Sequence, residues 1–384
     1  MDKVKVMSLI WSMGDGGAQQ VLINYLRDFK DDPDIDFRVY VYTEPTKSKY
    51  DKEIEDNNYS VYYLNNPKTK IQIPYIKRFF QKPISKAAWQ KAIHEFKPDI
   101  VHVHISALLL ATMPGIISEN IPIRFDTLHS SPYRYKGREQ KIISDAFQNR
   151  NVIPICVTEA QVHEAQDWYG ITKYEVVRNG VDIEGVKAKC CAKQEVRAIY
   201  GLAENTLVII GVGRLNPIKK YDLLIEAFAG VHKFNKDSVL LLAGEGKEKE
   251  NLQRVANKMG VTDSVKFLGN IADVTKLYCA ADVLAVTSDT ESSSLVAIEA
   301  QVCGTRCVLS AGVPVESILL KNTQRLSKDA SVNDWRDALM NDSYEGTPVA
   351  RIEDYEVHNM SKKMKEIYLK YYSDYMEKKH ADTK

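Results

Sequence analysis

The feature that most constrains the fold of this 384-residue chain is a regular alternation of short β-branched runs with longer helical patterns. Alternation on this scale predicts parallel sheets with helices on both faces. The series stops at a turn signal, Asn-Gly-Val-Asp at 179–182, and restarts after a polar stretch that ends at Ala203. The strands that we predict are Val4–Ile10, Phe37–Thr43, Ser60–Leu64, Ile100–His104, Ile123–Leu128, Val152–Val157, Tyr174–Arg178, Thr206–Gly213, Val239–Ala243, Val265–Leu268, Val283–Val286 and Cys307–Ser310.

The restart predicts an α/β chain with two Rossmann-like domains, residues 1–180 and 181–350, followed by a C-terminal segment, 351–384. This segment has a helical pattern from Tyr355 to Lys379, and its tyrosines are expected to pack back on the N-terminal domain. Open parallel sheets bind ligands at the carboxyl ends of their strands, so two facing domains would enclose a cleft. The other predicted helices include Ala18–Phe29, Tyr221–Phe234, Lys247–Lys258, Val274–Cys279 and Leu295–Cys303.

The overall composition excludes several classes of protein. A formal charge of +1 argues against general nucleic-acid binding, and the longest uncharged stretch, Ile105–Ser118, is shorter than the roughly 20 residues that span a bilayer. The six cysteines include no Cys-x-x-Cys pair and do not form a disulfide framework. Reduced thiols in a cytoplasmic protein are therefore expected.

Two carboxylates, Glu291 and Glu299, lie eight residues apart across a predicted helix start. Eight helical residues rise by about 12 Å, which suits a ligand that extends from a ribose across a diphosphate to a sugar ring. The free N–H groups of the helix N-terminus would also face a phosphate. The alternative is that both glutamates are solvated surface residues.

A pair of cations follows the first strand of the second domain. Arg214 ends that strand and Lys219 comes five residues later, so the two side chains can converge at one strand end. Arginine offers a bidentate fork for phosphate and lysine a point charge. Together they would balance a nucleotide diphosphate, and the alternative is a pair of solvated surface cations.

The order and spacing of these motifs resemble retaining glycosyltransferases of family 4, which have the GT-B fold. The resemblance covers nearly the whole chain and is strongest in the second domain. The runs that carry it are Gly213-Arg214-Leu215, Lys219, Leu224–Phe228, Leu242–Gly246, Phe267–Gly269, Asp282-Val283, Glu291 and Glu299-Ala300.

The resemblance implies a role for each residue in the second domain. Arg214 and Lys219 would hold the diphosphate and stabilise its departure, so both are predicted to be catalytic. Glu299 would accept the ribose hydroxyls, and Glu291 would meet the donor sugar as a further catalytic residue. Other donor contacts are expected from Ser293, Ser294 and Leu295, which follow Glu291, and from Ile271, whose main chain would hold the base.

In the first domain, Gly16 and Gly17 open a helix after the first strand, where backbone can approach a ligand closely. The resemblance places them against the donor phosphate. A dinucleotide fingerprint fails because Gln19 occupies its last glycine position, although Glu44 leaves an NAD-dependent oxidoreductase as a weak alternative.

Two histidines of the first domain are further candidates. The resemblance places His104 on the acceptor side and makes His129 a catalytic contact to the donor sugar near the scissile bond. The alternative for His129 is a packed core histidine. The residues around His102 and His104 offer no carboxylate or cysteine to complete a metal set.

Two residues depart from the family pattern. Ser292 and Lys220 stand where glycine is usual, so the donor sugar stays open. A second class of function, a non-catalytic glycosyltransferase-like partner subunit, also stays open for this reason.

The resemblance implies a metal-independent, retaining hexosyltransferase without a cofactor. It would move sugar from a UDP-sugar to a glycan or lipid-linked acceptor in cell-surface polysaccharide biosynthesis. No bound metal is predicted, since Arg214 and Lys219 would do the work of a divalent ion.

A basic stretch, Pro67–Lys97, carries eight lysines and arginines against a single acid, Glu95, with Trp89 among its interleaved aromatics. Cations with aromatics suit an anionic membrane surface, which predicts peripheral attachment to the inner face of the cell membrane. The alternative is a solvated helical face.

Overall fold

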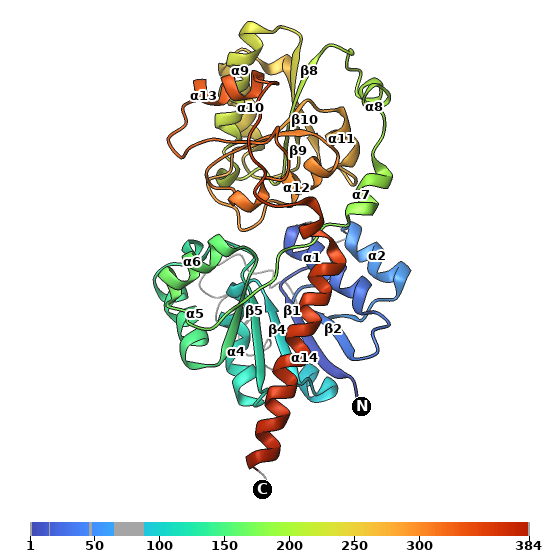
Figure 1. Ribbon diagram of the computed structural model, residues 1–384, viewed down its shortest axis with the longest axis vertical. Helices are drawn as coiled ribbons and strands as arrows, with labels where there is room; N and C mark the ends of the chain where they lie inside the picture. Colours follow the sequence, from blue (N-terminus) through green and yellow to red (C-terminus); the bar gives the residue numbers. More distant parts are fainter. Residues whose placement is uncertain (1, 15, 46–47, 65–87, 383–384) are drawn as a thin grey trace. The chain divides into compact units, whose positions relative to one another are not determined.

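The structure is a computed structural model that describes residues 2–14, 16–45, 48–64 and 88–382. The chain forms two compact units: Met1–Gly180 together with Val357–Lys384, and Val181–Glu356. We call them unit 1 and unit 2. Each contains a parallel sheet covered by helices, in agreement with the two Rossmann-like domains predicted from the alternation (Figure 1).

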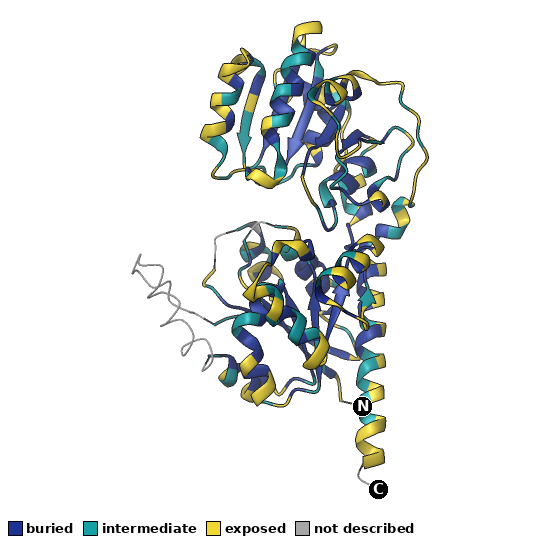
Figure 2. Ribbon diagram, turned by 90° about the vertical axis from the view of Figure 1, so that its left-hand side faces the viewer, coloured by how far each residue is buried: buried dark blue, intermediate teal, exposed yellow. Residues whose placement is uncertain are grey.

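Unit 1 is built on a seven-stranded sheet in the order β3-β2-β1-β4-β5-β6-β7. The central strands are buried on both faces, which explains why their sequences are nearly continuous apolar runs (Figure 2). Every pair of neighbouring strands is parallel. The strands are β1 (Val4–Ile10), β2 (Ile35–Val41), β3 (Val61–Tyr63), β4 (Ile100–His104), β5 (Ile123–Thr127), β6 (Val152–Cys156) and β7 (Glu175–Val176).

The helices of unit 1 pack apolar stripes on this sheet. In α1 the stripe includes Leu22, Leu26 and Phe29, spaced as one face of a helix. Local caps fix other helices: the Thr158 side chain accepts the backbone N–H of Gln161 at the start of α6. The helices are α1 (Gly17–Phe29), α2 (Lys49–Asn57), α4 (Leu109–Ser118), α5 (Arg138–Asn149) and α6 (Glu159–Tyr169).

The last helix, α14 (Val357–Asp382), belongs to unit 1 and runs along its sheet (Figure 1). Met364 and Tyr368 are fully buried in the same core as β1 and α1. The Tyr368 hydroxyl lies 2.6 Å from Nδ1 of His102 on β4. The chain thus returns to its first unit after completing the second.

Unit 2 has a six-stranded parallel sheet in the order β10-β9-β8-β11-β12-β13. The sequence did not predict β13, because this two-residue strand is half-buried and has no apolar run. The strands are β8 (Leu207–Val212), β9 (Ser238–Ala243), β10 (Val265–Gly269), β11 (Val283–Val286), β12 (Arg306–Leu309) and β13 (Gln324–Arg325). The helices are α7 (Ile183–Lys189), α8 (Lys193–Ile199), α9 (Tyr221–Phe234), α10 (Lys249–Lys258), α11 (Thr275–Ala280), α12 (Leu295–Val302) and α13 (Val332–Met340).

Both sheets have a topological switch point, where consecutive strands are laid down on opposite sides of a first strand. The switch point lies between β1 and β4 in unit 1 and between β8 and β11 in unit 2. Open α/β sheets bind their ligands outside the carboxyl ends of the strands at this place. The loops after these four strands are therefore where functional side chains are expected.

Most of the basic stretch, residues 67–87, lies outside the described residues. Its last aromatic does not fit the predicted membrane surface: Trp89 is 2% exposed and packs in a core cluster with Tyr42 and Val103. That part of the prediction is wrong, because the indole serves the fold of unit 1. In the part of the chain that the structure describes, no helix is both long and apolar enough to span a bilayer.

Candidate functional site

The loop after β8 holds Lys219 in a fixed position. Gly213 has a φ of 144°, and a Cβ built there would lie 3.2 Å from Cε of Lys219, so the lysine stem lies close against this glycine. The backbone N–H of Lys219 donates to the Asn216 side chain, and its carbonyl accepts the Thr287 hydroxyl at 2.6 Å. The ammonium is thus carried on a clamped turn rather than on a free loop.

Lys219 and Glu291 form an ion pair across the switch point of unit 2. The Lys219 Nζ lies 2.6 Å from Glu291 Oε1, and the side chains are 20% and 16% exposed. The Ser288 hydroxyl donates to the same carboxylate oxygen at 2.7 Å. The structure therefore brings together two predicted catalytic residues that are 72 positions apart in the sequence.

Arg214 lies two residues after the end of β8 and is exposed. Among the described residues its guanidinium has no hydrogen-bond or ion-pair partner, whereas the neighbouring Lys219 is already paired. All five guanidinium N–H donors are accordingly available to an anion. The two predicted cations thus differ in state, one neutralised by a carboxylate and one unpaired.

The segment after Glu291 leads into α12 with several unused polar groups. The Glu291 N–H donates to Gly312 O at 2.8 Å, and a Cβ on Gly312 would lie 2.3 Å from the Asp289 carbonyl, so only glycine allows this approach. The hydroxyls of Ser292 and Ser294 are buried without a partner within the described part of the chain. The first N–H groups of α12 also have no intrahelical acceptor. Unsatisfied buried groups of this kind indicate a place for a polar ligand.

Glu299 lies within α12, four residues after the first residue of the helix, Leu295. Its Oε2 accepts the Tyr278 hydroxyl of α11 at 3.0 Å. Burial, and then the charge of Glu299, raise the pKa of Tyr278 well above its usual range, so this hydroxyl stays a donor. Tyr278 therefore orients the carboxylate that was predicted to bind a ribose.

The remaining predicted contacts of unit 2 are less constrained. Ser293 and Leu295 are half-buried at the start of α12, beside the unpartnered hydroxyls. Ile271 is half-buried in the loop between β10 and α11 and packs against the apolar cluster that contains Leu277 and Val286. The structure places all of them in unit 2, and their roles stay predictions.

In unit 1, Gly16 and Gly17 lie at the start of α1, the first helix after β1. Gly16 is the N-cap, with extended backbone, and as a glycine it offers no side chain to accept the first N–H groups of the helix. The helix begins one residue earlier than predicted, at Gly17. This terminus is suited to an anion.

Three histidines gather near the carboxyl ends of β4 and β5: His102 and His104 lie in β4, and His129 follows β5. His104 Nδ1 lies 2.9 Å from His129 Nε2, and the ring centroids of His102 and His104 are 4.2 Å apart. Nε2 of His102 contacts the Thr127 hydroxyl at 2.7 Å, while Nε2 of His104 is buried without a partner among the described residues. We call these three residues the histidine cluster. The prediction that His104 and His129 both belong to a site leaves out His102, which ties the cluster to α14.

Burial controls the protonation of the histidine cluster. It lowers the pKa of His102 and of His129 to about 3, and that of His104 well below its usual value. Repulsion from neighbouring histidines lowers the pKa of His102 and His104 further. At neutral pH the cluster is therefore uncharged and able to donate or accept hydrogen bonds.

Sequence reasoning missed the residues that orient the predicted ones. Ser288 carried a weak signal, since it precedes Glu291 by three positions as in a capping motif. Tyr278 and Thr287 carried no sequence signal, because their partners, Glu299 and Lys219, come from other parts of unit 2.

Comparison with known proteins relates both units of the chain to glycosyltransferases. Residues 192–341 match the family described as "Glycosyl transferases group 1", and residues 15–184 match "Glycosyltransferase Family 4". The HepE protein of Anabaena, determined in complex with UDP-glucose, is similar with a TM-score of 0.78, covering 94% of this chain and 98% of that one at 19% identity. The fold is GT-B. The sucrose-phosphate synthase of Thermosynechococcus elongatus shares this GT-B fold, with a TM-score of 0.76 at 15% identity over 97% of this chain and 100% of that one.

Among curated proteins, the D-inositol 3-phosphate glycosyltransferase of Mycolicibacterium smegmatis is 31% identical over 219 residues. That match covers 54% of this chain and 48% of the relative. The chain thus spans about half the length of this curated relative. Both units of the GT-B fold nevertheless carry a match to a glycosyltransferase family.

Proposed function

We propose that this chain is a glycosyltransferase whose unit 2 binds a nucleotide-sugar donor. The observation that carries the proposal is the arrangement at the switch point of unit 2. An arginine, a clamped lysine and a carboxylate lie at the ends of β8 and β11, beside the start of α12. Within the described part of the chain, the arginine and the hydroxyls of Ser292 and Ser294 have no partner. These groups suit an anionic ligand rich in hydroxyls.

In this proposal the donor is a UDP-sugar and its diphosphate competes with Glu291 for Lys219. Arg214, which has no partner among the described residues, would engage the phosphates first. Lys219 would then share its charge between the diphosphate and Glu291, which frees carboxylate lone pairs for the sugar hydroxyls. Glu299, oriented by Tyr278, would accept the ribose hydroxyls. The Anabaena protein with the same fold, determined with UDP-glucose, supports this choice of donor class.

We further propose that transfer proceeds with retention at the anomeric carbon and without a metal. Positive charge at Arg214 and Lys219 would stabilise the departing phosphate, as preorganised electrostatics do in other active sites. The departing phosphate oxygen would take the proton of the acceptor hydroxyl. The acceptor is a glycan or lipid-linked molecule of cell-surface polysaccharide biosynthesis, and a cytoplasmic location at the membrane surface goes with that role. Those acceptor and membrane roles, and the contacts of Gly16, Gly17, His104 and His129, stay predictions.

The test uses the purified full chain and a panel of nucleotide sugars. A bound donor raises the melting temperature by mass action, which selects the sugar and the base. Hydrolysis or transfer of the selected donor is then followed by proton NMR, in which the first product formed is expected to have the anomeric configuration of the donor. Turnover is measured with and without EDTA and is expected to be unchanged.

Three outcomes would contradict parts of this account. Inverted product would overturn retention, and loss of turnover in EDTA that Mg²⁺ or Mn²⁺ restores would overturn metal independence. Binding without any hydrolysis or transfer would instead identify a non-catalytic partner subunit, the alternative that Ser292 and Lys220 kept open.

A further inference from the structure

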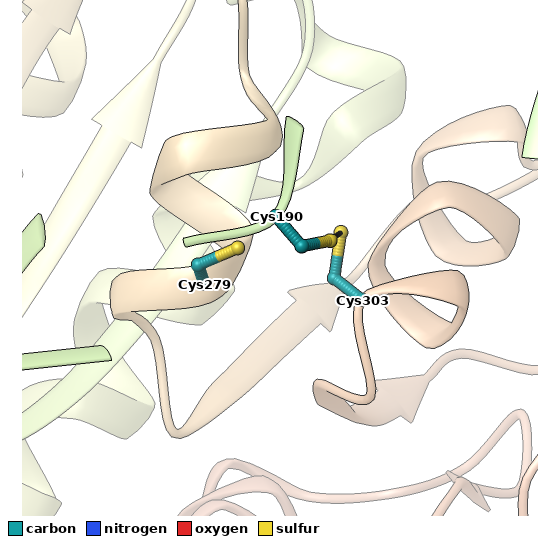
Figure 3. Close-up of side chains that lie close together, drawn as sticks. All are labelled: Cys190, Cys279 and Cys303. Atoms are coloured by element: carbon teal, nitrogen blue, oxygen red, sulfur yellow. Dashed lines mark hydrogen bonds between the residues drawn. The ribbon is translucent and has the colours of Figure 1, made fainter. Parts of the chain in front are cut away.

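Three cysteines of unit 2 converge at the ends of three helices (Figure 3). Cys190 is the C-cap of α7, Cys279 lies in α11, and Cys303 is the C-cap of α12. Their sulfur atoms all lie within 4.8 Å of one another, and the Cys190 and Cys303 sulfurs are 3.3 Å apart. We call these residues the thiol cluster. It is the only such grouping of cysteine, histidine or acidic ligands in the part of the chain that the structure describes.

From this geometry we propose that the thiol cluster is a binding site for a thiophilic cation, Zn²⁺, held by three thiolates. Zinc binds cysteine sulfur at about 2.3 Å in tetrahedral geometry, which separates neighbouring sulfurs by about 3.8 Å. The Cys190 and Cys303 sulfurs are 3.3 Å apart and all three sulfurs lie within 4.8 Å of one another, so small side-chain rotations would complete the site. Cysteine sulfur is also the ligand type that favours zinc over magnesium or calcium.

The surroundings of the thiol cluster fit a cation as well. The backbone N–H of Cys191 donates to the Cys279 sulfur at 3.5 Å, which is the kind of outer-shell contact that orients a ligating thiolate. Cys190 is exposed, whereas Cys279 and Cys303 are half-buried, so the site has an entry path and a sheltered side. The fourth position of a tetrahedral site would be left to a water molecule.

Burial raises the pKa of the Cys303 thiol, and Cys190 and Cys279 raise it further. Burial also raises the pKa of Cys279. Three thiolates so close together repel one another, and a divalent cation removes that repulsion as the protons are released.

The site would act at a distance from the proposed transfer chemistry. Cys279 directly follows Tyr278, and Cys303 lies four residues after Glu299, so the cation would join the helices that carry the tyrosine–carboxylate pair. It would also tie them to the end of α7, since α7 packs on both α11 and α12. The cation is thus structural, and the proposal is independent of whether the chain transfers sugar.

The experiment titrates metal-free, fully reduced full-length protein with Co²⁺ and then with Zn²⁺. We expect one equivalent of Co²⁺ to produce sulfur-to-metal charge-transfer absorption in the near ultraviolet, Zn²⁺ to abolish it, and the melting temperature to rise with Zn²⁺. Replacing a ligand should cost more than the roughly 10–100-fold typical of outer-shell partners. Cys190→Ser and Cys303→Ser are therefore each expected to weaken binding by about 100-fold or more.

Matched variants separate the cluster from the other thiols. Cys156→Ala removes a buried thiol of unit 1 and should leave Co²⁺ absorption and affinity unchanged. Exposed Cys190 is the variant least able to disturb folding, and circular dichroism checks each protein. Absence of charge-transfer absorption in the wild type, or affinity unchanged in Cys190→Ser, would overturn the proposal. So would a Cys190–Cys303 disulfide, seen as a two-hydrogen mass loss without reductant, in a protein that binds no Zn²⁺ when reduced.

Discussion

The switch points of the two sheets occupy equivalent places in equivalent topologies, yet they present different chemistry. In unit 2 the ends of β8 and β11 carry a lysine–glutamate ion pair and an arginine that has no partner among the described residues. In unit 1 the ends of β4 and β5 carry the histidine cluster, which burial keeps neutral. The contrast teaches that the same scaffold can prepare one edge for a charged ligand and the other for neutral hydrogen-bonding groups.

The difference follows from where water reaches. Lys219 and Glu291 keep 20% and 16% of their side-chain surface exposed, so water still solvates both charged groups in part. The ion pair can therefore open when an anion binds to Lys219. His102 and His104 have none of their surface exposed, and a proton on either would be desolvated. The predictions that follow test whether charge in unit 2 and neutrality in unit 1 are the properties that matter.

The largest effect is expected from Lys219→Ala. Removal of one preorganised contact to a developing negative charge costs about 2.7–4 kcal/mol, so kcat should fall by about 10²–10³-fold. Steady-state kinetics with a saturating donor measure it. The control is Lys220→Ala, which removes a neighbouring, more exposed cation and should retain near-wild-type kcat. Equal losses in the two variants would mean that unit 2 needs general positive charge, not this ammonium.

Glu299→Ala is expected to reduce turnover by about 10²-fold, because the carboxylate that would accept the ribose hydroxyls is lost and Tyr278 is left without its acceptor. Glu299→Gln keeps an oxygen that accepts the Tyr278 hydroxyl but removes the negative charge. Its turnover should lie between that of the wild type and that of Glu299→Ala. Glu250→Ala, an exposed glutamate on α10, serves as the control. Activity of Glu299→Ala close to wild type would remove this residue from the site.

In unit 1, Tyr368→Phe is expected to lower the free energy of unfolding by about 1–3 kcal/mol. The substitution leaves the buried Nδ1 of His102 without its hydrogen-bond partner. Urea denaturation measures the change, and Tyr372→Phe on the partly exposed side of α14 should change stability little. Identical effects of the two variants would show that the bond to His102 does not anchor the helix.

The smallest effect is expected in how the free energy of unfolding depends on pH. The folded pKa of His102, about 3, lies below its unfolded value of 6.5, so the stability that the neutral ring provides is complete above pH 6.5 and is lost as pH falls toward 3. Each such histidine contributes a slope of about 1.4 kcal/mol per pH unit in this window. The buried Asp126, whose pKa burial raises, acts with the opposite sign but is present in every variant.

The measurement compares wild type and His102→Gln by urea denaturation between pH 7 and pH 5. The variant is expected to lose less stability on acidification, because one neutral histidine has been removed from the cluster. Parallel pH profiles would show that His102 is protonated in the folded protein and that the contrast between the two switch points is wrong.

Much of the fold could be predicted because local patterns of apolar residues determine many of its strands and helices. The predicted limits of β1, β4, β11 and α9 coincide with those observed, since each is a buried apolar run or an amphipathic stripe. The two-residue β13 has no such pattern and pairs only because β12 offers it an edge. The prediction placed Trp89 on a membrane surface because its neighbours in the sequence are basic, whereas its side chain is buried in a core.

The candidate site could be predicted residue by residue but not contact by contact. Lys219 and Glu291 were each named, yet nothing in a linear sequence states that residues 72 positions apart pair across a switch point. Tyr278 and the thiol cluster were missed for the same reason, because their partners come from different helices of unit 2. Sheet order supplies that information, and it emerges only on folding.

The most direct test of the central claim is a crystal structure of the chain with UDP bound. The account predicts the ribose hydroxyls within hydrogen-bond distance of Glu299, the diphosphate at Arg214 and Lys219, and a Lys219–Glu291 distance longer than the 2.6 Å of the ligand-free pair. A nucleotide bound at another place, with Lys219 and Glu291 still paired at that distance and the Tyr278–Glu299 hydrogen bond unchanged, would contradict it.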